Sequence, residues 1–424
     1  MAFSYRAGMT EMTFELPSHD WLLEPCVQTV IDAVERDGDE VRIVGGAVRN
    51  TILGEPIGDI DMATTALPQD VISRGNAAGL KVIPTGIEHG TVTVLCEGRP
   101  FELTTLRSDT QTDGRHAVVA FGRDWRGDAE RRDFTMNALY LDRSGKLHDP
   151  LGGLEDCLNR RVRFIGNPVD RIREDYLRIF RFFRFFATYG AHNPDAVALE
   201  AIKTEVGGVA QLSAERINKE LLATLIAPNS VRAVEDLVAC KALQAVVPNA
   251  VHVDAFRWFC ELGTHVPEVR DPALALGVLG VRSRADAKVM TSELRLSNAM
   301  ARLLETSLSV REFIGETFWS EATEYWQSLL FYYGREGALK GYAFASAQAD
   351  EPLAISQVVD GLGRLQELEI PVFPVGGRDL IAHGVMPGVE LGEMLDALKK
   401  YWVQTAFSKQ KEDLLSKFLN RLED

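Results

Sequence analysis

The sequence has few cysteines and no hydrophobic segment long enough to span a bilayer. Its five cysteines are odd in number, scattered, and do not follow the spacing of a zinc site. We therefore expect reduced thiols in a cytosolic protein. A signal-peptide hydrophobic region and the P-loop, zincin and dinucleotide fingerprints are also missing. These absences exclude the corresponding secreted, membrane-spanning and cofactor-binding classes and favour a cytoplasmic location.

Acidic residues outnumber basic ones, but the basic residues are locally concentrated. The 424 residues carry a formal net charge of −15, whereas residues 160–184 contain eight arginines against three acidic residues, a local charge of +5. Such a basic belt on an acidic chain predicts local binding of nucleotides or RNA. The length and the 46% hydrophobic content predict two to four domains.

Two aspartates alternate with an apolar residue in the sequence DID at 59–61. In an extended strand, residues i and i+2 point to the same face, so the carboxylates of Asp59 and Asp61 can converge. Mg²⁺ needs few protein oxygens when substrate phosphate supplies the others. Such an ion can lower the pKa of an attacking hydroxyl and stabilise departing pyrophosphate. The aspartate pair therefore predicts a Mg²⁺ site.

A glycine pair precedes these aspartates. The segment 41–44 reads as a buried strand that runs into Gly45 and Gly46 and then into a helical pattern. Glycines let a backbone turn approach phosphate, the following helix N-terminus offers free N–H groups, and Arg49 adds a forked donor. A glycine turn, an arginine and DxD within 17 residues predict a nucleotide phosphate site.

A third motif, EDYLRIFR at 174–181, predicts base recognition. Its apolar density favours a helix on which Asp175 and Arg178 are i, i+3 neighbours. Aspartate only accepts and arginine only donates hydrogen bonds, so the pair suits cytosine or adenine and conflicts with uracil or guanine. An ordinary helical ion pair is the alternative reading of these two residues alone.

Together with RRDFTMNA at 131–138, these motifs resemble in kind and order those of the class II tRNA nucleotidyltransferase and bacterial poly(A) polymerase family, a branch of the DNA polymerase β-like superfamily. The resemblance is strong over roughly residues 40–225 and weaker over 376–415. It implies an α+β fold: a polymerase β-like nucleotidyltransferase head with a mixed sheet, followed by an all-helical neck, body and tail. The family usually has aspartate where this chain has Asn50.

The resemblance also assigns roles to residues. The implied catalytic residues are Asp59 and Asp61, which would hold Mg²⁺, and Glu102, a general base or outer metal ligand unless it is only a polar residue on the exposed face of its strand. Arg131 and Arg132 would bind triphosphate, and Asp133 a sugar hydroxyl. The implied nucleotide-binding residues are Gly45, Gly46, Arg49, Arg131, Arg132, Asp133, Asp175, Arg178 and Arg181.

Three further segments match the family. The polar segment 107–129 predicts a mobile loop, which the family associates with switching from C to A addition. HDPLGGLEDC at 148–157 resembles the link to the next domain, with the Gly152 and Gly153 turn as a possible hinge. SAERINKELL at 213–222 resembles a segment in which Glu215 and Arg216 would support the nucleotide-binding helix.

The resulting expectation is template-independent addition of C, C and A to the 3′ end of tRNA from CTP and ATP, with release of pyrophosphate. We expect no membrane and no DNA partner, and the oligomeric state stays open. Bacterial poly(A) polymerase, A-only addition and a catalytically silent RNA-binding protein are the alternatives. The expected domains are an extension (1–25), head (26–150), neck (151–230), body (231–350) and a tRNA-contacting tail (351–424).

Overall fold

The computed structural model describes residues 16–17, 19–113, 116–247, 249–351 and 353–419. The chain forms two compact units, one comprising residues 1–220 and 227–245 and the other residues 221–226 and 246–424. None of the helices in these described ranges is long and apolar enough to cross a membrane. Most of the expected N-terminal extension lies outside the described residues.

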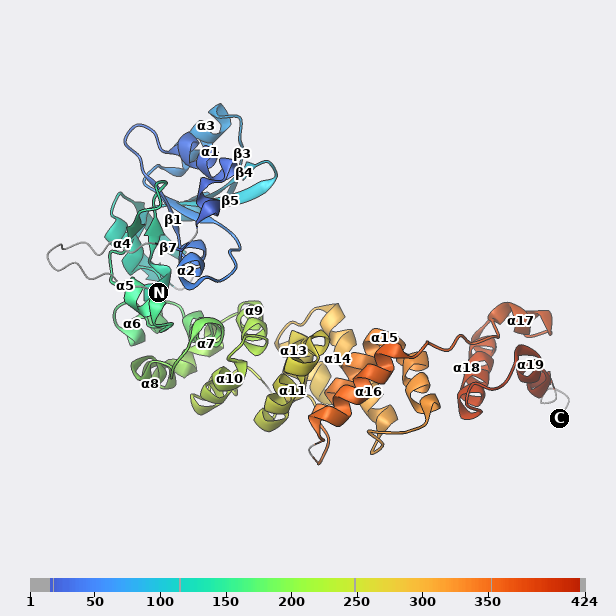
Figure 1. Cartoon of the computed structure of the whole chain (residues 1–424). Coiled ribbons are helices and arrows are strands. Elements are labelled where there is room, and N and C mark those ends of the chain that lie inside the picture. The colour runs from blue at the N-terminus through green and yellow to red at the C-terminus, as the bar shows by residue number, and fades with distance from the viewer. Residues whose placement is uncertain (1–15, 18, 114–115, 248, 352, 420–424) are drawn as a thin grey trace. The chain divides into compact units, whose positions relative to one another are not determined.

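A seven-stranded mixed sheet opens the first unit and confirms the predicted α+β head (Figure 1). Its order is β3-β4-β5-β2-β1-β8-β9, and β2 and β5 pair in parallel while the other neighbours pair antiparallel. The strands are β1 (Val41–Val44), β2 (Asp61–Thr64), β3 (Lys81–Gly86), β4 (Thr91–Cys96), β5 (Arg99–Thr105), β8 (Tyr140–Leu141) and β9 (Leu147–His148).

Short helices cover this sheet. Helices α1 (Pro25–Val34) and α3 (Pro68–Ala77) lie side by side against β3 and β4, and each starts with proline at a position that needs no N–H partner (Figure 1). Helix α2 (Gly46–Leu53) follows β1 directly and packs on it. The apolar side chains of β1 are buried, which fixes the direction in which α2 leaves the sheet.

The segment 107–129 is more ordered than the irregular loop that we predicted. Strands β6 (Arg107–Asp113) and β7 (His116–Phe121) form a separate antiparallel hairpin, and α4 (Trp125–Glu130) follows it. Pairing between the two arms supplies the backbone hydrogen bonds, although the first arm has no apolar alternation to indicate a strand. The hairpin and α4 therefore connect β5 to the RRD motif.

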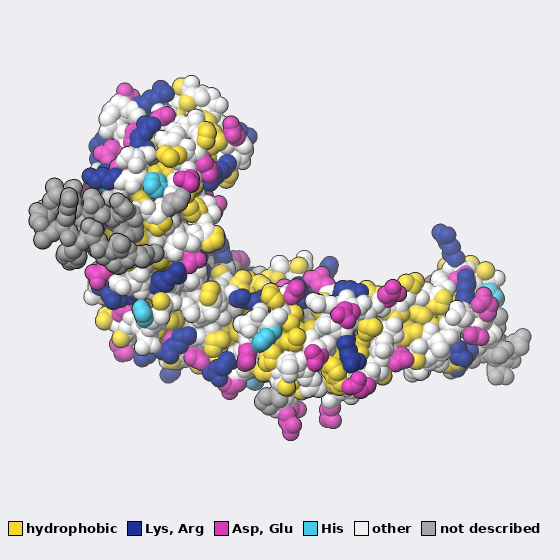
Figure 2. Space-filling view, viewed as in Figure 1, with side chains coloured by type: hydrophobic (Ala, Val, Ile, Leu, Met, Phe, Trp, Pro, Cys, Tyr) yellow, Lys and Arg dark blue, Asp and Glu magenta, His cyan; other side chains and the backbone are white. Residues whose placement is uncertain are grey.

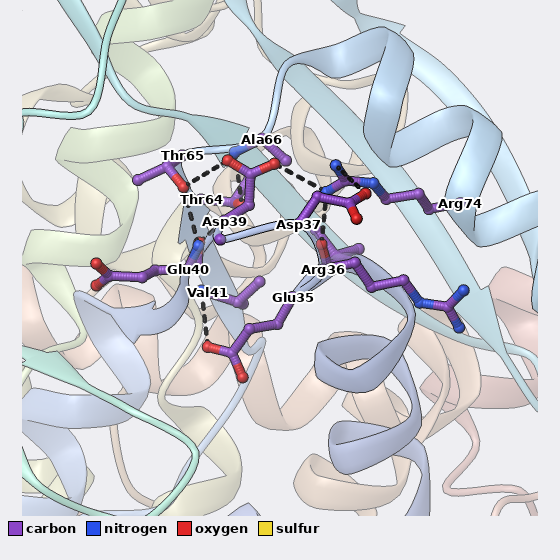
Figure 3. A network of polar contacts seen from close by, with 12 residues as sticks. Glu35, Arg36, Asp37, Asp39, Glu40, Val41, Thr64, Thr65, Ala66 and Arg74 are labelled. Atoms are coloured by element: carbon purple, nitrogen blue, oxygen red, sulfur yellow. Dashed lines mark hydrogen bonds and ion pairs between the residues drawn. The ribbon is translucent and has the colours of Figure 1, made fainter.

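A polar network holds the turn between α1 and β1 (Figure 3). The Asp39 carboxylate accepts hydrogen bonds from Thr65 Oγ1 and Arg74 Nη1, both at 2.9 Å, and from Arg123 Nη1 at 2.6 Å. Burial alone would raise the pKa of Asp39, but these hydrogen bonds outweigh it and lower the pKa. Because Thr65 follows β2, the network fixes β1 beside β2, and Arg123 ties in the end of the hairpin.

Six helices follow β9 in the chain. They are α5 (Gly153–Leu158), α6 (Pro168–Glu174), α7 (Leu177–Tyr189), α8 (Ala196–Glu205), α9 (Ala214–Leu225) and α10 (Ser230–Ala239). Five of them lie in the first unit, and the fifth in order, α9, ends in residues 221–226, which belong to the second unit. One prediction was wrong: Asp175 and Arg178 do not share a helix surface. Asp175 has extended backbone dihedrals between α6 and α7, and its Oδ1 accepts the Leu177 N–H at 3.1 Å. A carboxylate that satisfies a free helical N–H favours such a break.

The second unit is helical throughout its described residues, which confirms the predicted all-helical remainder. Its helices are α11 (Val253–His265), α12 (Pro272–Gly280), α13 (Arg284–Glu293), α14 (Asn298–Ile314), α15 (Thr323–Ala347), α16 (Ile355–Glu367), α17 (Gly377–Ala382), α18 (Val389–Gln404) and α19 (Lys411–Leu419). Helix α15 is kinked at Gly334, where φ is +67°. Basic and acidic side chains are interspersed on the face in view in Figure 2.

Glycine is required at position 153 because the backbone of Thr135 lies too close to admit a Cβ atom. The Gly153 N–H donates to Asp149 Oδ1 at 2.8 Å, and a Cβ placed on Gly153 would lie 2.2 Å from the carbonyl oxygen of Thr135. We predict that Gly153→Ala lowers the free energy of unfolding by about 1–3 kcal/mol, because backbone atoms must shift to admit the methyl group. Thermal unfolding measures the loss. Gly207→Ala is the control, since nothing lies within 4 Å of its added Cβ; equal melting temperatures for the two variants would contradict this account.

Candidate active site

The sheet brings the three predicted catalytic carboxylates to one place. Asp61 opens β2 and lies directly opposite Glu102 on the parallel strand β5, and Asp59 precedes it by two residues. Burial raises the pKa of Asp61, the negative charges of Glu102 and Asp59 raise it further, and the Arg132 charge only partly compensates. A divalent cation would relieve this repulsion on Asp61, so the electrostatics are compatible with the predicted metal site.

The donors fit a hard divalent cation, although they do not form a complete cage. Asp59, Asp61 and Glu102 all keep solvent-exposed surface, although enough protein surrounds the Asp61 carboxylate to desolvate it in part. Among the described residues, no group of three or more His, Cys, Asp or Glu side chains is arranged as a ready metal cluster. Carboxylate oxygens suit a cation such as Mg²⁺, which completes its shell with water and phosphate.

A glycine turn lies next to the carboxylates. Gly45 has φ +72°, which favours glycine, and forms the N-cap of α2. The nearest atom to a Cβ built on Gly45 would be Nη1 of Arg132, at 4.0 Å. The structure therefore brings together Gly45, Gly46 and Arg132 as a cationic turn beside Asp61.

Arg49 lies beneath this turn and not on its open side. It is 6% exposed, and its guanidinium donates to Asn137 Oδ1 at 2.5 Å and to the Tyr189 hydroxyl at 2.7 Å. Its Nη2 would lie 3.8 Å from a Cβ on Gly46. Arg49 thus ties α2 to α7, and its predicted contact with phosphate would have to compete with these bonds.

The departure from the family pattern at Asn50 has a visible consequence. Its Oδ1 accepts from Nε and Nη2 of Arg49 at 3.1 and 2.9 Å, while its Nδ2 donates to the carbonyl oxygen of Pro56 at 2.6 Å. A carboxylate could accept from Arg49 but could not donate to Pro56. The amide therefore holds the segment that leads into Asp59.

The RRD motif is held by a residue that our sequence reasoning missed. Asp128 is 1% exposed and accepts hydrogen bonds from Arg131, Arg132 and the Tyr140 hydroxyl. Burial would raise the pKa of Asp128, but the charges of Arg132 and Arg131 lower it overall. The spacing i, i+3 and i, i+4 between this acid and the two arginines was the available signal.

Asp133 and Arg181, both predicted to bind nucleotide, form an internal ion pair. Asp133 is 9% exposed; its carboxylate accepts from Arg181 Nε and Asn137 Nδ2, both at 2.9 Å, and from the Phe134 N–H at 2.8 Å. Burial would raise the pKa of Asp133, whereas Arg181 and Asn137 lower it. This pair joins the head to α7, and a sugar hydroxyl would have to share the Asp133 oxygens.

Arginine side chains of α6 and α7 donate hydrogen bonds to the backbone of the RRD motif. Arg171, which the sequence did not single out, donates through Nη2 to the carbonyl oxygens of Arg131 and Arg132 at 2.6 and 2.5 Å. Arg178 donates to the Arg131 carbonyl oxygen at 3.3 Å, and Glu174 accepts from both Arg171 and Arg178. The segment predicted to recognise the base is therefore hydrogen-bonded directly to the predicted triphosphate ligands.

Asp175 has a separate partner. Arg216 Nη2 donates to Asp175 Oδ2 at 2.7 Å, so α9 fixes the carboxylate at the break between α6 and α7. This contact links the segment 213–222 to Asp175, and the supporting role that the resemblance implies for the segment stays a prediction.

Comparisons of this chain with profiles and with known proteins indicate the same family. The profile described as "Poly A polymerase head domain" matches residues 41–163, and "Probable RNA and SrmB- binding site of polymerase A" matches residues 194–252. The chain is 34% identical to "CCA tRNA nucleotidyltransferase 1, mitochondrial" of Danio rerio, over 98% of this chain and 95% of that protein. A "CCA-adding enzyme" of Lactobacillus helveticus is 30% identical, with 94% and 96% covered. The chain belongs to the CCA tRNA nucleotidyltransferase family.

A solved structure of this family agrees. The Bacillus stearothermophilus CCA-adding enzyme in complex with CTP superposes with a TM-score of 0.72 and 30% identity, covering 94% of this chain and 99% of that one. Membership confirms the predicted resemblance, the α+β head with its helical remainder and the class of enzyme, a CCA tRNA nucleotidyltransferase. The individual roles of the site residues stay predictions.

Loss of Arg181 tests the ion pair that joins head and neck in this nucleotidyltransferase. We predict that Arg181→Ala lowers the free energy of unfolding by about 3–5 kcal/mol, because Asp133 would stay buried without its partner. Arg143→Ala is the control: Arg143 and Asp32 are 45% and 58% exposed, and an exposed pair contributes about 0–1 kcal/mol. Thermal unfolding compares them, and equally small losses would show that Asp133 does not depend on Arg181.

The metal-site carboxylates should reduce the stability of the metal-free protein. The pKa of Asp61 is raised in the folded state, so its charged form destabilises the fold above that pKa, and the effect vanishes below the unfolded pKa. We predict that Asp61→Asn raises the melting temperature in EDTA near neutral pH, not in strong acid, and abolishes incorporation.

Asp142→Asn serves as the control, because we expect it to change the melting temperature in the opposite direction. Burial would raise the pKa of Asp142, but hydrogen bonds from Ser144 and His148 lower it, so its carboxylate stabilises the fold at neutral pH. This variant should melt below the wild type. A lower melting temperature for Asp61→Asn would contradict the carboxylate cluster.

Proposed function

We propose that this chain adds C, C and A in turn to the 3′ end of tRNA, from CTP and ATP, with release of pyrophosphate. The observation that carries the proposal is the extent of the similarity: CCA tRNA nucleotidyltransferases align over nearly the entire chain, whereas the two polymerase A profiles match residues 41–163 and 194–252. This favours CCA addition over polyadenylation. The carboxylates, glycine turn and arginine pair of one compact unit argue against a catalytically silent RNA-binding protein.

Asp59 and Asp61 would hold the divalent ion, for which we propose Mg²⁺. When bound, it lowers the pKa of the attacking 3′ hydroxyl and neutralises charge on the leaving pyrophosphate. Glu102, exposed opposite Asp61, is placed to accept the hydroxyl proton or to bind an outer water. Arg132 and the Gly45 turn would receive the triphosphate, because they lie beside the carboxylates.

Base selection would use Asp175 and Arg178. Arg216 and the helix break fix the Asp175 carboxylate as an acceptor, and the contacts of Arg178 with Glu174 and the Arg131 backbone fix its guanidinium as a donor. An acceptor and a donor held in place match cytosine and adenine, and leave buried groups unpaired with uracil or guanine. The same bonds link the chosen base to the arginines that hold its phosphates.

The compartment and the domain limits are also proposals. The vertebrate relatives carry "mitochondrial" in their names, whereas we propose the cytoplasm for this chain. Cell fractionation with a tagged chain tests this, and recovery in organelles would contradict it. Residues 1–25, 26–150, 151–230, 231–350 and 351–424 remain the proposed extension, head, neck, body and tRNA-contacting tail.

Incorporation on shortened tRNA tests the activity. We predict that tRNA lacking its three terminal nucleotides gains two C and one A and then no more, when CTP, ATP and Mg²⁺ are present. CTP alone should add two C, and ATP alone should act only on tRNA that already ends in both C. Gel analysis with labelled nucleotides at single-nucleotide resolution measures each product.

Each alternative gives a different pattern. A addition confined to tRNA that already carries both C would indicate an A-adding enzyme, and continued A addition to any RNA would indicate a poly(A) polymerase. Binding of tRNA without incorporation by the wild-type chain would support the silent RNA-binding protein. Asp61→Asn is the matched control for residual activity, since it removes one metal ligand and keeps the size of the side chain.

A further inference from the structure

We propose that Asp128 is a positioning residue that sets Arg131 and Arg132 to receive the triphosphate of the incoming nucleotide. The inference rests on the proposed function, because it concerns the nucleotide site of the same reaction. Asp128 lies on α4, between the β6–β7 hairpin and the RRD motif, and it would act on the nucleotide through these arginines.

The contacts use one edge of each guanidinium. Arg131 donates through Nε at 2.9 Å and through Nη2 to Asp128 Oδ1, and Arg132 donates through Nε at 3.2 Å and Nη2 at 3.0 Å to Oδ2. Each oxygen therefore accepts two N–H groups of one guanidinium, and these hydrogen bonds are charge-assisted. The Tyr140 hydroxyl, fully buried, donates to Oδ2 at 2.8 Å and keeps the carboxylate plane fixed.

The remaining nitrogen of Arg132 is directed at the phosphate turn. Its Nη1 is the atom nearest to a Cβ built on Gly45, at 4.0 Å, and its charge reaches Asp61. Arg131 and Arg132 are each 19% exposed, so most of each side chain is enclosed while one part faces outward. The carboxylate thus holds the inner edges and leaves outer N–H groups for a ligand.

Charge explains why a carboxylate is needed there. Two adjacent guanidinium groups repel one another, and one buried carboxylate between them removes most of that repulsion while leaving the trio with a net positive charge. A polyanionic triphosphate is the ligand that such a trio suits. On the other side, Arg171 holds the backbone oxygens of both arginines, so neither side chain can leave by a backbone shift.

The test compares nucleotides that differ only in phosphate number. Dissociation constants of CTP and CMP are measured by calorimetry on the full chain, with Mg²⁺ and without tRNA, for the wild type and Asp128→Asn. We expect CTP to bind roughly tenfold to hundredfold more weakly to the variant, since charge-assisted hydrogen bonds are lost, while CMP binding changes little. The preference for CTP over CMP therefore falls. Unchanged preference in a folded Asp128→Asn variant would overturn the proposal.

Three further variants separate positioning from folding. Glu130→Gln alters a carboxylate on the same helix that bonds Arg126 at 3.0 Å, and it should keep the wild-type preference; an equal loss there would assign the effect to α4 and overturn the proposal. If Asp128→Asn does not fold, Tyr140→Phe is measured instead and must lower the preference for CTP over CMP. An unchanged preference in Tyr140→Phe would then overturn the proposal. The double variant Arg132→Lys, Asp128→Asn should lose no more of the preference for CTP over CMP than the more affected single variant, because Asp128 acts through Arg132.

Nucleotide binding without tRNA also keeps the two proposals distinguishable. A wild-type chain that fails to add C, C and A on shortened tRNA would overturn the proposed function. The preference for triphosphate, and its dependence on Asp128, would still decide the role of this residue.

Discussion

Buried charges must be paired. In the first unit, residues of the head are paired with residues of the helices that follow it. Asp133, within the head, is paired with Arg181 of α7, and Arg171 of α6 donates to the backbone of Arg131 and Arg132. An unpaired ion in these positions would cost several kcal/mol. The requirement therefore ties the predicted nucleotide site and helices α6 and α7 into one compact unit.

The predicted metal site has the opposite electrostatic character. There the negative charges of Glu102 and Asp59 raise the pKa of Asp61, and Arg132 compensates only in part. In the proposed reaction, a cation and a triphosphate would complete this charge balance. On this proposal, the paired charges inside the unit would hold the geometry, and the incompletely compensated carboxylates would bind the cation.

The local structure that the sequence predicted depends on short-range geometry. The turn at Gly45 follows from its place between strand and helix, whereas β2 begins only at Asp61, so Asp59 precedes the strand that was expected to hold both aspartates. The family resemblance supplied Glu102, which pairs with Asp61 from a neighbouring strand, a pairing that could not be derived from spacing. What the sequence could not show was how side chains share partners. Arg49 and Asp133 have the residue types of ligands, yet their partners lie inside the protein, and the break at Asp175 depends on a single cap.

The most direct test of the account is a crystal structure of the chain soaked with CTP and Mn²⁺, with anomalous diffraction to locate the metal. The account predicts an anomalous peak bound by Asp59 and Asp61 at about 2.0–2.2 Å, next to Glu102, with triphosphate oxygens on Arg132 and the Gly45 turn. A peak elsewhere, or a triphosphate that contacts neither Arg132 nor the glycine turn, would contradict the assignment of this site.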